Sequence, residues 1–206
     1  MTAPYAVRVG VTGHLNFERE KALELSVKIE MALERVRTFC RPSPDRLVVF
    51  TAVSALAEGA DRLVAKAVLS TRGGRLEAVL PFEEGIYTED FTSEQSKREF
   101  HMLCREASSV TLAPPMPESG EDDTEVRNNR YEWAGRFVVD HSDVLLALWN
   151  GRPSQGTGGT AEIVLYALQR SKPVFYIPTE GGELVEYLGE GEVHDAFRPT
   201  GIFDAY

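Results

Sequence analysis

Short apolar stretches alternate with longer amphipathic ones along most of the chain. The apolar stretches are rich in β-branched residues and several stop at glycine or proline, as buried parallel strands do. They predict strands at residues 6–13, 46–53, 75–82, 109–113, 143–149 and 172–178. The stretches between them predict helices at residues 18–39, 57–69, 93–107, 129–141 and 160–170, because their apolar residues recur at helical spacing.

Strands that alternate with helices are connected by βαβ crossovers, which place the strands in parallel and the helices on both faces of the sheet. We therefore expect an α/β fold, a Rossmann-like three-layer α/β/α sandwich with a mostly parallel sheet of about six strands. No internal repeat or domain boundary is visible, so we expect a single domain over residues 1–206. Residues 114–128 are acidic and rich in turn formers, which fits either a solvated surface loop or a mobile flap.

The composition narrows the class of partner. The 206 residues are 43% apolar and include 22 basic against 32 acidic side chains, for a net charge of −10. Broad nucleic-acid and anionic-membrane surfaces need clustered Lys and Arg, so we expect neither nucleic acid nor membrane as a partner. A small phosphate ligand stays possible, because backbone N–H groups can hold an anion without a formal charge.

Cysteine and histidine give no sign of a metal or redox centre. Cys40 and Cys104 form no CxxC motif and are expected to be buried apolar residues. His101, His141 and His194 show no metal-ligand spacing, and we expect neither a metal nor a cofactor. The sequence shows no secretory signal and no apolar run long enough for a membrane span, so we expect a cytoplasmic protein.

The stretch "NGRPSQGTGGTAEIV" between the fifth strand and the last helix is the strongest candidate site. It contains Gly151, Gly156, Gly158 and Gly159 just before a helix that begins at about Thr160. A helix N-terminus offers unpaired N–H donors and a partial positive charge, and glycines let a phosphate approach them. Thr157 and Thr160 add hydroxyl donors, with Thr160 also available as a cap. The alternative is a flexible turn followed by a helix cap.

Other candidates follow the first, second and fifth strands. Gly13 permits a tight turn after which His14 faces the crevice, or else lies at the surface or caps a helix. Glu58 holds ribose hydroxyls and Asp61 orients the loop or an arginine, or both merely favour the helix dipole. Trp149 belongs to the core or stacks on a base.

The motifs "GVTGH", "LAEGADRLVA" and "DVLLALWNGRPSQGTGGTAEIV" together resemble a bacterial branch of the SLOG superfamily, over roughly residues 7–177. SLOG domains are Rossmann-like relatives of the LOG phosphoribohydrolases, and the superfamily includes DprA-like proteins and the N-terminal sensing region of TRPM channels. The resemblance implies self-association and a nucleotide-derived ligand. The positions it marks are Gly13, His14, Ser54, Glu58, Gly59, Asp61, Gly156, Gly158, Gly159, Thr160 and Glu162.

One departure from the LOG pattern bears on activity. LOG hydrolases carry PGGxGTxxE, and here Ile163 occupies the position of the glutamate while Glu162 lies one residue early, about 100° around the helix. The favoured expectation is therefore sensing of a nucleotide, an ADP-ribose-like compound or a cyclic nucleotide. The first alternative is an N-glycosidic bond-cleaving enzyme, a phosphoribohydrolase or a relative of nucleoside 2-deoxyribosyltransferases, with Glu162 or Glu58 as the catalytic carboxylate. The second is a scaffold with a vestigial pocket.

Overall fold

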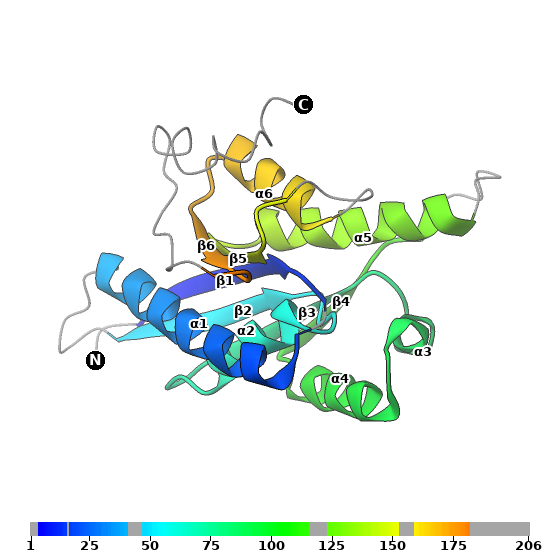
Figure 1. Cartoon of the computed structure of the whole chain (residues 1–206), viewed down its shortest axis with the longest axis horizontal. Coiled ribbons are helices and arrows are strands. Elements are labelled where there is room, and N and C mark those ends of the chain that lie inside the picture. Colours follow the sequence, from blue (N-terminus) through cyan, green and yellow to red (C-terminus); the bar gives the residue numbers. More distant parts are fainter. Residues whose placement is uncertain (1–3, 16, 41–46, 116–122, 153–158, 182–206) are drawn as a thin grey trace.

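The chain folds around one six-stranded parallel sheet with the strand order β4-β3-β2-β1-β5-β6 (Figure 1). The computed structural model describes residues 4–15, 17–40, 47–115, 123–152 and 159–181. The strands are β1 (Tyr5–Gly13), β2 (Val48–Ser54), β3 (Arg75–Leu80), β4 (Ser109–Leu112), β5 (Val144–Trp149) and β6 (Val174–Pro178). After β1 the chain builds outward through β2, β3 and β4, and then crosses to the other side of β1 for β5.

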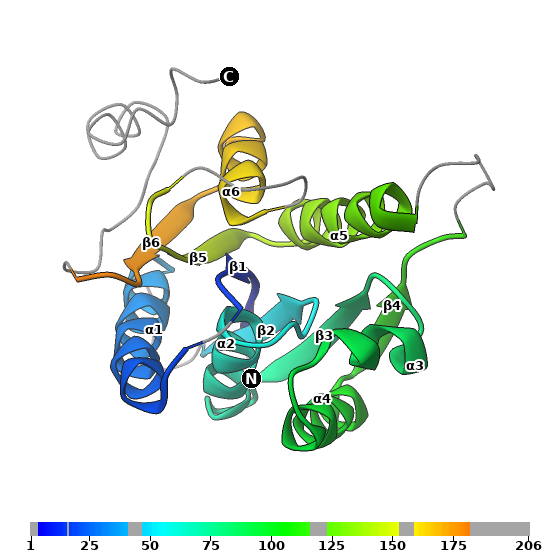
Figure 2. The same cartoon turned by 45° about the vertical axis from the view of Figure 1, so that its right-hand side comes forward.

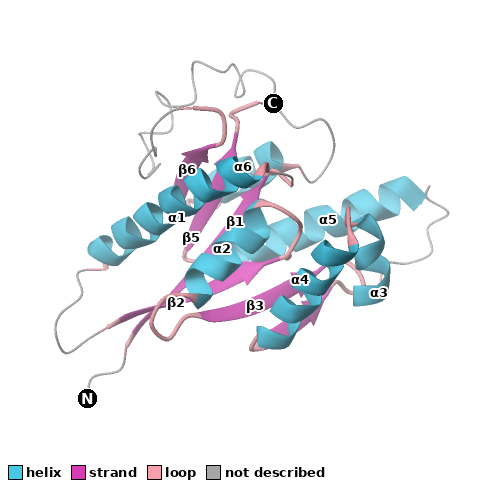
Figure 3. Cartoon of the chain, turned by 60° about the horizontal axis from the view of Figure 1, so that its bottom comes forward, coloured by secondary structure: helices cyan, strands magenta, loops and turns pink. Residues whose placement is uncertain are grey.

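Helices cover both faces of this sheet, so the predicted three-layer Rossmann-like fold is confirmed. They are α1 (Arg19–Phe39), α2 (Ala60–Leu69), α3 (Glu84–Tyr87), the 3-10 helix η1 (Thr88–Asp90), α4 (Glu94–Glu106), α5 (Asp123–Asp140) and α6 (Thr160–Gln169). Figure 2 shows α5 and α6 above the sheet and α1, α2 and α4 below it. Seen from below in Figure 3, these last three helices lie in front of the strands.

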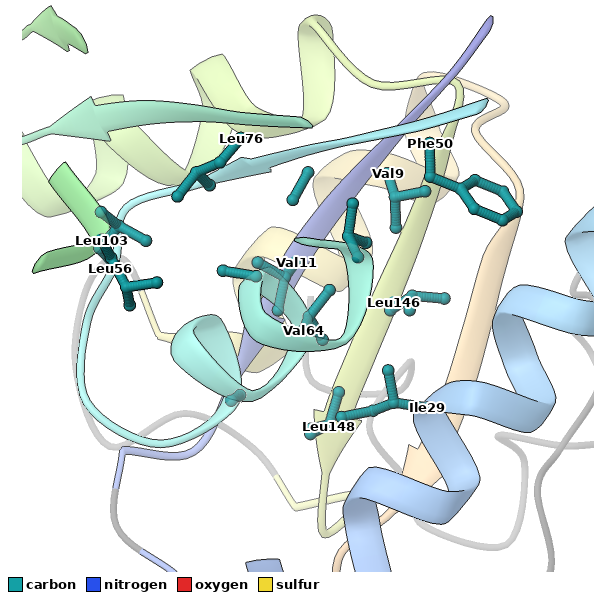
Figure 4. Close-up of a cluster of buried hydrophobic side chains, with 14 of the residues drawn as sticks. Val9, Val11, Ile29, Phe50, Leu56, Val64, Leu76, Leu103, Leu146 and Leu148 are labelled. Atoms are coloured by element: carbon teal, nitrogen blue, oxygen red, sulfur yellow. The ribbon is translucent and has the colours of Figure 1, made fainter. Parts of the chain in front are cut away.

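The sheet separates two apolar clusters. On the lower face, side chains of β1 and β5 meet α1 and α2, as Val11, Val64, Ile29 and Leu148 do in Figure 4. On the upper face, α5 and α6 pack on the opposite sides of the strands, and Trp149 joins them. Central strands buried on both faces explain why "DVLLALW" reads as a continuous apolar run.

The structure corrects several local predictions. α5 begins at Asp123, so the last part of the predicted loop or flap 114–128 is helical, and residues 116–122 lie outside the described ranges. α2 begins at Ala60, three residues later than predicted, and α3 with η1 was not predicted. Cys104 is buried as expected, whereas Cys40 is only half-buried. Among the described residues, no helix combines the length and apolar character needed to cross a bilayer.

Candidate functional site

A cavity of about 660 Å³ opens at the carboxyl ends of β1 and β5. These neighbouring strands lead in opposite directions, because the chain continues from β1 toward β2 and from β5 toward β6. Such a reversal of strand order leaves a crevice that the connecting loops do not fill, and ligands of open α/β sheets bind there. The lining comes from the segments after β1, β2 and β5, from α3 and η1, and from the facing sides of α5 and α6.

The N-terminus of α6 forms one wall of the cavity. Gly159, Thr160, Ala161 and Ile163 line it, and the helix begins at Thr160 as predicted. Its N-cap residue is Gly159, so the predicted capping by the Thr160 hydroxyl is wrong. The first turn has N–H groups without intrahelical acceptors, and it presents them and the positive end of the helix dipole to the cavity. Gly156, Thr157 and Gly158 lie outside the described residues.

The end of β1 and the residue after it contribute backbone groups and the imidazole ring of His14 to the site. The His14 amide donates to Leu148 O at 3.0 Å, and the His14 ring accepts from the Asn150 amide at Nε2, 3.1 Å away. The ring lines the cavity, as predicted, and bridges the turns that follow β1 and β5. A Cβ on Gly13 would lie 2.5 Å from both Leu148 O and Ala60 Cβ. Close packing of the strand against α2 and β5 therefore explains Gly13 without a ligand.

The turn after β5 is held by its own side chains. Asn150 Oδ1 accepts from the Arg152 amide at 3.1 Å, and Trp149 Nε1 donates to Arg152 O at 2.8 Å. Gly151 is buried within this turn and does not line the cavity, whereas Arg152 does. Trp149 is 2% exposed and packs in the upper core. Although Trp149 also borders the cavity, its burial and packing favour the core alternative for this residue.

Asp61 lies buried beside the cavity and holds the loop after β2. Its carboxylate accepts from Ser54 Oγ at 3.1 Å, and Ser54 Oγ in turn accepts from the Leu56 amide at 3.0 Å. Burial raises the pKa of Asp61 to about 6, against the opposing effect of hydrogen bonds from Ser54 and the Ala57 and Ala55 amides. These are the contacts of a loop-orienting carboxylate. Ser54 is fully buried and does not line the cavity.

Gly59 and Glu58 belong mainly to the connection between the second strand and α2. A Cβ on Gly59, which has a φ of +80°, would lie 1.8 Å from Leu15 O. Ala60 N then donates to His14 O, so the N-terminus of α2 is occupied by the chain itself. Glu58 lines the cavity, but its Oε1 accepts from the Thr92 amide and hydroxyl at 3.0 and 2.9 Å. Burial raises the pKa of Glu58, and hydrogen bonds from Ser96 and Thr92 outweigh that effect and bring the pKa below its ordinary value.

An aromatic wall, composed of Tyr87, Phe91 and Tyr131, faces the cavity and was not predicted. Tyr87 packs on Phe91 with ring centroids 5.0 Å apart and on Tyr131 at 6.2 Å. Asp90 Oδ2 accepts from the Tyr131 hydroxyl and, at 2.6 Å, from Arg127 Nη2, which joins α5 to η1. Tyr87 and Phe91 lie four residues apart, whereas Tyr131 comes from α5, 40 residues further along the chain, so no local pattern links all three.

The structure does not bring Glu162 to the cavity. Ile163 lines it instead, in keeping with its place in the LOG glutamate position. Glu162 is half-buried in the first turn of α6 on another side of the helix. Ser54, Gly59, Gly151 and Glu162 are thus the predicted site residues within the described ranges that lie outside the lining.

The charged groups divide the cavity into two ends. Glu58, Asp61 and Asp90 lie on the side of α2 and η1, whereas the α6 N-terminus, His14 and Arg152 lie on the side of β1 and β5. The first end is rich in carboxylate acceptors, and the second is rich in N–H donors. At the second end, Arg152 Nη2 is paired with Glu180 Oε2 at 2.8 Å, and His14 Nε2 accepts from the Asn150 amide. A ligand with an anionic group at one end and N–H or O–H donors at the other matches this polarity.

No family model matches the sequence, and no curated protein is significantly similar to it. The structure is similar to that of DNA processing protein A from Helicobacter pylori, with a TM-score of 0.52 at 14% identity, covering 92% of this chain and 72% of the other. That protein is described by its single-stranded DNA binding mode. DprA-like proteins are among those that the motifs resemble, so the comparison supports the resemblance at the level of the fold.

The comparison also corrects two expectations. The sequence predicts a small nucleotide-derived ligand that is sensed or, in the alternative, cleaved. The structural neighbour points instead to nucleic acid as the class of ligand. The expected absence of a nucleic-acid partner is overturned by the same finding. That expectation assumed a broad basic surface, whereas a cavity that admits one unpaired nucleotide needs only local donors.

Proposed function

We propose that this protein binds single-stranded nucleic acid by taking an unpaired nucleotide of the strand into the cavity between β1 and β5. The observation that carries the proposal is the cavity's polarity, which sets a helix N-terminus opposite a wall of aromatic rings and carboxylates. The cavity of about 660 Å³ has the size of a site for a compact organic ligand. The structural similarity to a single-stranded DNA-binding protein and the SLOG-like motifs support the same class of ligand.

The phosphate of the bound nucleotide belongs at α6. Gly159 leaves the approach to the helix free of a side chain, and the amides of Thr160 and Ala161 lie in the first turn, where anions are favoured. The Thr160 hydroxyl and the exposed Arg152 can contribute further donors beside them. None of these contacts reads sequence, which suits a binder of strand backbone.

The base belongs at the opposite wall. Every nucleobase has a flat π-face, and stacking on aromatic side chains is the usual means by which proteins hold unpaired bases. The half-buried Tyr131 is the ring of this wall proposed to stack on the base, since the Arg62 guanidinium lies over the Phe91 ring at 4.4 Å. The carboxylates of the wall accept hydrogen bonds from N–H groups of a base or from sugar hydroxyls. A paired base inside a duplex cannot enter the cavity, so the arrangement selects single strands.

The net charge of −10 fits a narrow site of this kind. Contact with one or two phosphates through neutral amides releases few counterions, so the affinity should fall only weakly with salt, with a slope of about −0.7 per phosphate for a single strand. A broad basic channel would give a much steeper dependence. The salt dependence therefore distinguishes a nucleotide-sized site from a long electrostatic groove.

The test is a titration of end-labelled single-stranded and duplex DNA of the same sequence, followed by fluorescence anisotropy. Thr160→Glu places a carboxylate in the first turn of α6, where it favours the helix dipole but repels a phosphate. Gln95→Glu makes the same charge change in the first turn of α4, outside the cavity. We expect tighter binding of the single strand, a loss of at least about tenfold in Thr160→Glu, and no more than about a twofold change in Gln95→Glu.

Equal binding of duplex and single strand, or an equal loss in the two variants, would overturn the proposal. The first outcome would show binding outside the cavity. The second would show that net charge alone controls the interaction. Thermal unfolding of both variants checks that each is folded before its affinity is interpreted.

A further inference from the structure

The hydroxyl group of Tyr87 is buried at the wall of the cavity and has no hydrogen-bond partner in the described part of the chain. Tyr87 is 1% exposed, and among the described residues its oxygen forms no hydrogen bond. Buried polar groups in proteins are nearly always paired, and each exception needs a reason. A phenol in this place is costly to the free protein, since phenylalanine would fill the same space without an unpaired donor.

The ring of Tyr87 is held in place by its neighbours. Phe91 and Phe100 contact it edge to face, with centroids 5.0 and 5.6 Å away, and Phe82 lies 6.5 Å away. The packing therefore explains an aromatic ring at this position and leaves the oxygen unexplained. Burial raises the pKa of Tyr87 well above its ordinary value, and the negative charges of Asp61 and Asp90 act in the same direction. The hydroxyl thus stays protonated and remains a donor.

We propose that the Tyr87 hydroxyl is the group that hydrogen-bonds the edge of the unpaired base. This inference rests on the proposed function and assigns the base end of that site. An unpaired base exposes ring nitrogens and carbonyl oxygens, which can accept a hydrogen bond from a phenol O–H. Its N–H groups can donate to the carboxylates of the same wall. Because the oxygen is closed to water in the free chain, a base meets it only with a shift of the lining side chains.

The inference also explains why the unpaired hydroxyl lies at this wall and not elsewhere in the core. The aromatic wall and the carboxylates together bring the Tyr131 ring, one donor and several acceptors to the same side of the cavity, which suits the face and the edge of a base. The N-terminus of α6 presents backbone N–H donors and suits a phosphate. The two ends of one nucleotide are thereby distinguished.

The experiment combines Tyr87→Phe with a change in the ligand. A short thymine oligonucleotide is compared with one in which difluorotoluene, a thymine-shaped base without strong hydrogen-bonding groups, replaces each thymine. We expect the wild-type protein to bind the analogue about tenfold more weakly than the thymine strand, and Tyr87→Phe to bind both strands about equally, at the weaker level. The variant should unfold at a temperature equal to or above that of the wild type.

Tyr166→Phe is the matched control. Its hydroxyl donates to Asp140 at 3.0 Å, and neither residue lines the cavity, so this variant should unfold at a lower temperature and keep both affinities. Strand binding with an equal loss on both ligands in Tyr87→Phe, or a lower unfolding temperature for that variant, would overturn the inference and leave the proposed function standing. Absence of binding to any single strand by the wild type would overturn the proposed function itself.

Discussion

The parallel strands begin at one side of the sheet, here called the amino edge, and end at the other, the carboxyl edge. Each of these sides contains a hollow of similar size, and only one hollow has the chemistry of a binding site. At the amino ends of β1, β5 and β6 a hollow of about 620 Å³ is lined almost entirely by apolar side chains, with Asp143 as its charged exception. The Asp143 carboxylate accepts from the Arg8 amide at 2.8 Å. At the carboxyl ends, the cavity of about 660 Å³ brings together a helix N-terminus, an imidazole, carboxylates and an unpaired phenol.

This contrast shows that volume alone does not identify a binding site. At the amino edge, polar groups around the strands are bonded to one another, as Arg8 is to Glu77 and Lys172 is to the Ser142 carbonyl. A polar ligand would find few partners there. At the carboxyl edge the chain directs donors and acceptors into the same space, and at least one of them has no partner within the described protein.

The largest expected effect separates two glycines, one at each edge. Gly59 and Gly73 have similar φ values of +80° and +76°, but a Cβ would lie 1.8 Å from Leu15 O at the first and 3.6 Å from Val49 side-chain atoms at the second. Gly59→Ala should lower the free energy of unfolding by about 3 kcal/mol or more, because backbone must move. Gly73→Ala should cost only about 1 kcal/mol of backbone strain. Chemical denaturation measures both, and similar costs would contradict the close approach of α2 to the β1 turn.

The next effect concerns Asp61, the buried carboxyl of the carboxyl edge. Its pKa is raised from an ordinary 3.8 to about 6 in the folded chain, so the folded state binds the proton more tightly than the unfolded state. Protonation of Asp61 therefore adds on the order of 2–3 kcal/mol to the free energy of unfolding. This contribution is fully present below about pH 4 and is lost as the pH rises through about 6. Denaturation from pH 4 to 7 should show this loss in the wild type relative to Asp61→Asn. A constant difference between the two proteins would contradict the raised pKa.

A smaller effect is expected at the amino edge. Arg8 Nη1 donates to Glu77 Oε1 at 2.8 Å, and both side chains are partly exposed. Arg8→Met should lower the free energy of unfolding by about 1 kcal/mol, as for other solvent-screened pairs. The affinity for single-stranded DNA should stay within about twofold. A marked loss of affinity would place the binding surface at the amino ends of the strands and contradict the proposed site.

The smallest effect is expected for Glu162→Gln. Glu162 does not line the cavity, and Ile163 does. The affinity for single-stranded DNA should therefore change by no more than about twofold, in the direction of tighter binding because a negative charge near the phosphate position is removed. A large change in anisotropy titrations would return Glu162 to the site.

The sequence predicts the fold well because periodicity reports burial. Continuous apolar runs such as 143–149 predict central strands, and the helical spacing of Leu25, Ile29 and Val36 predicts the buried face of α1. The fold class also predicts that the cavity lies at the carboxyl ends of the strands. Glycines are less informative, because Gly13 and Gly59 serve the close approach of chain segments, and the residue type does not distinguish that from contact with a ligand.

The aromatic wall could not be predicted. Tyr87 lies in a helix of four residues, too short to show a periodic pattern, and Phe91 follows a 3-10 turn. Tyr131 lies in a helix whose first turns are so polar that their sequence predicts a loop. Only the packing of α5 beside α3 and η1 brings Tyr131 to the other two rings, and that packing depends on contacts between segments about 40 residues apart.

Hydrogen–deuterium exchange with and without a short single strand compares the two edges directly in one experiment. If a nucleotide enters the cavity between β1 and β5, exchange should slow in the first turns of α6 and in residues 84–91. It should stay unchanged in residues 5–7 and 143–144, which border the hollow at the amino edge. Slowed exchange at the amino edge with none at α6 would contradict the location of the site proposed here.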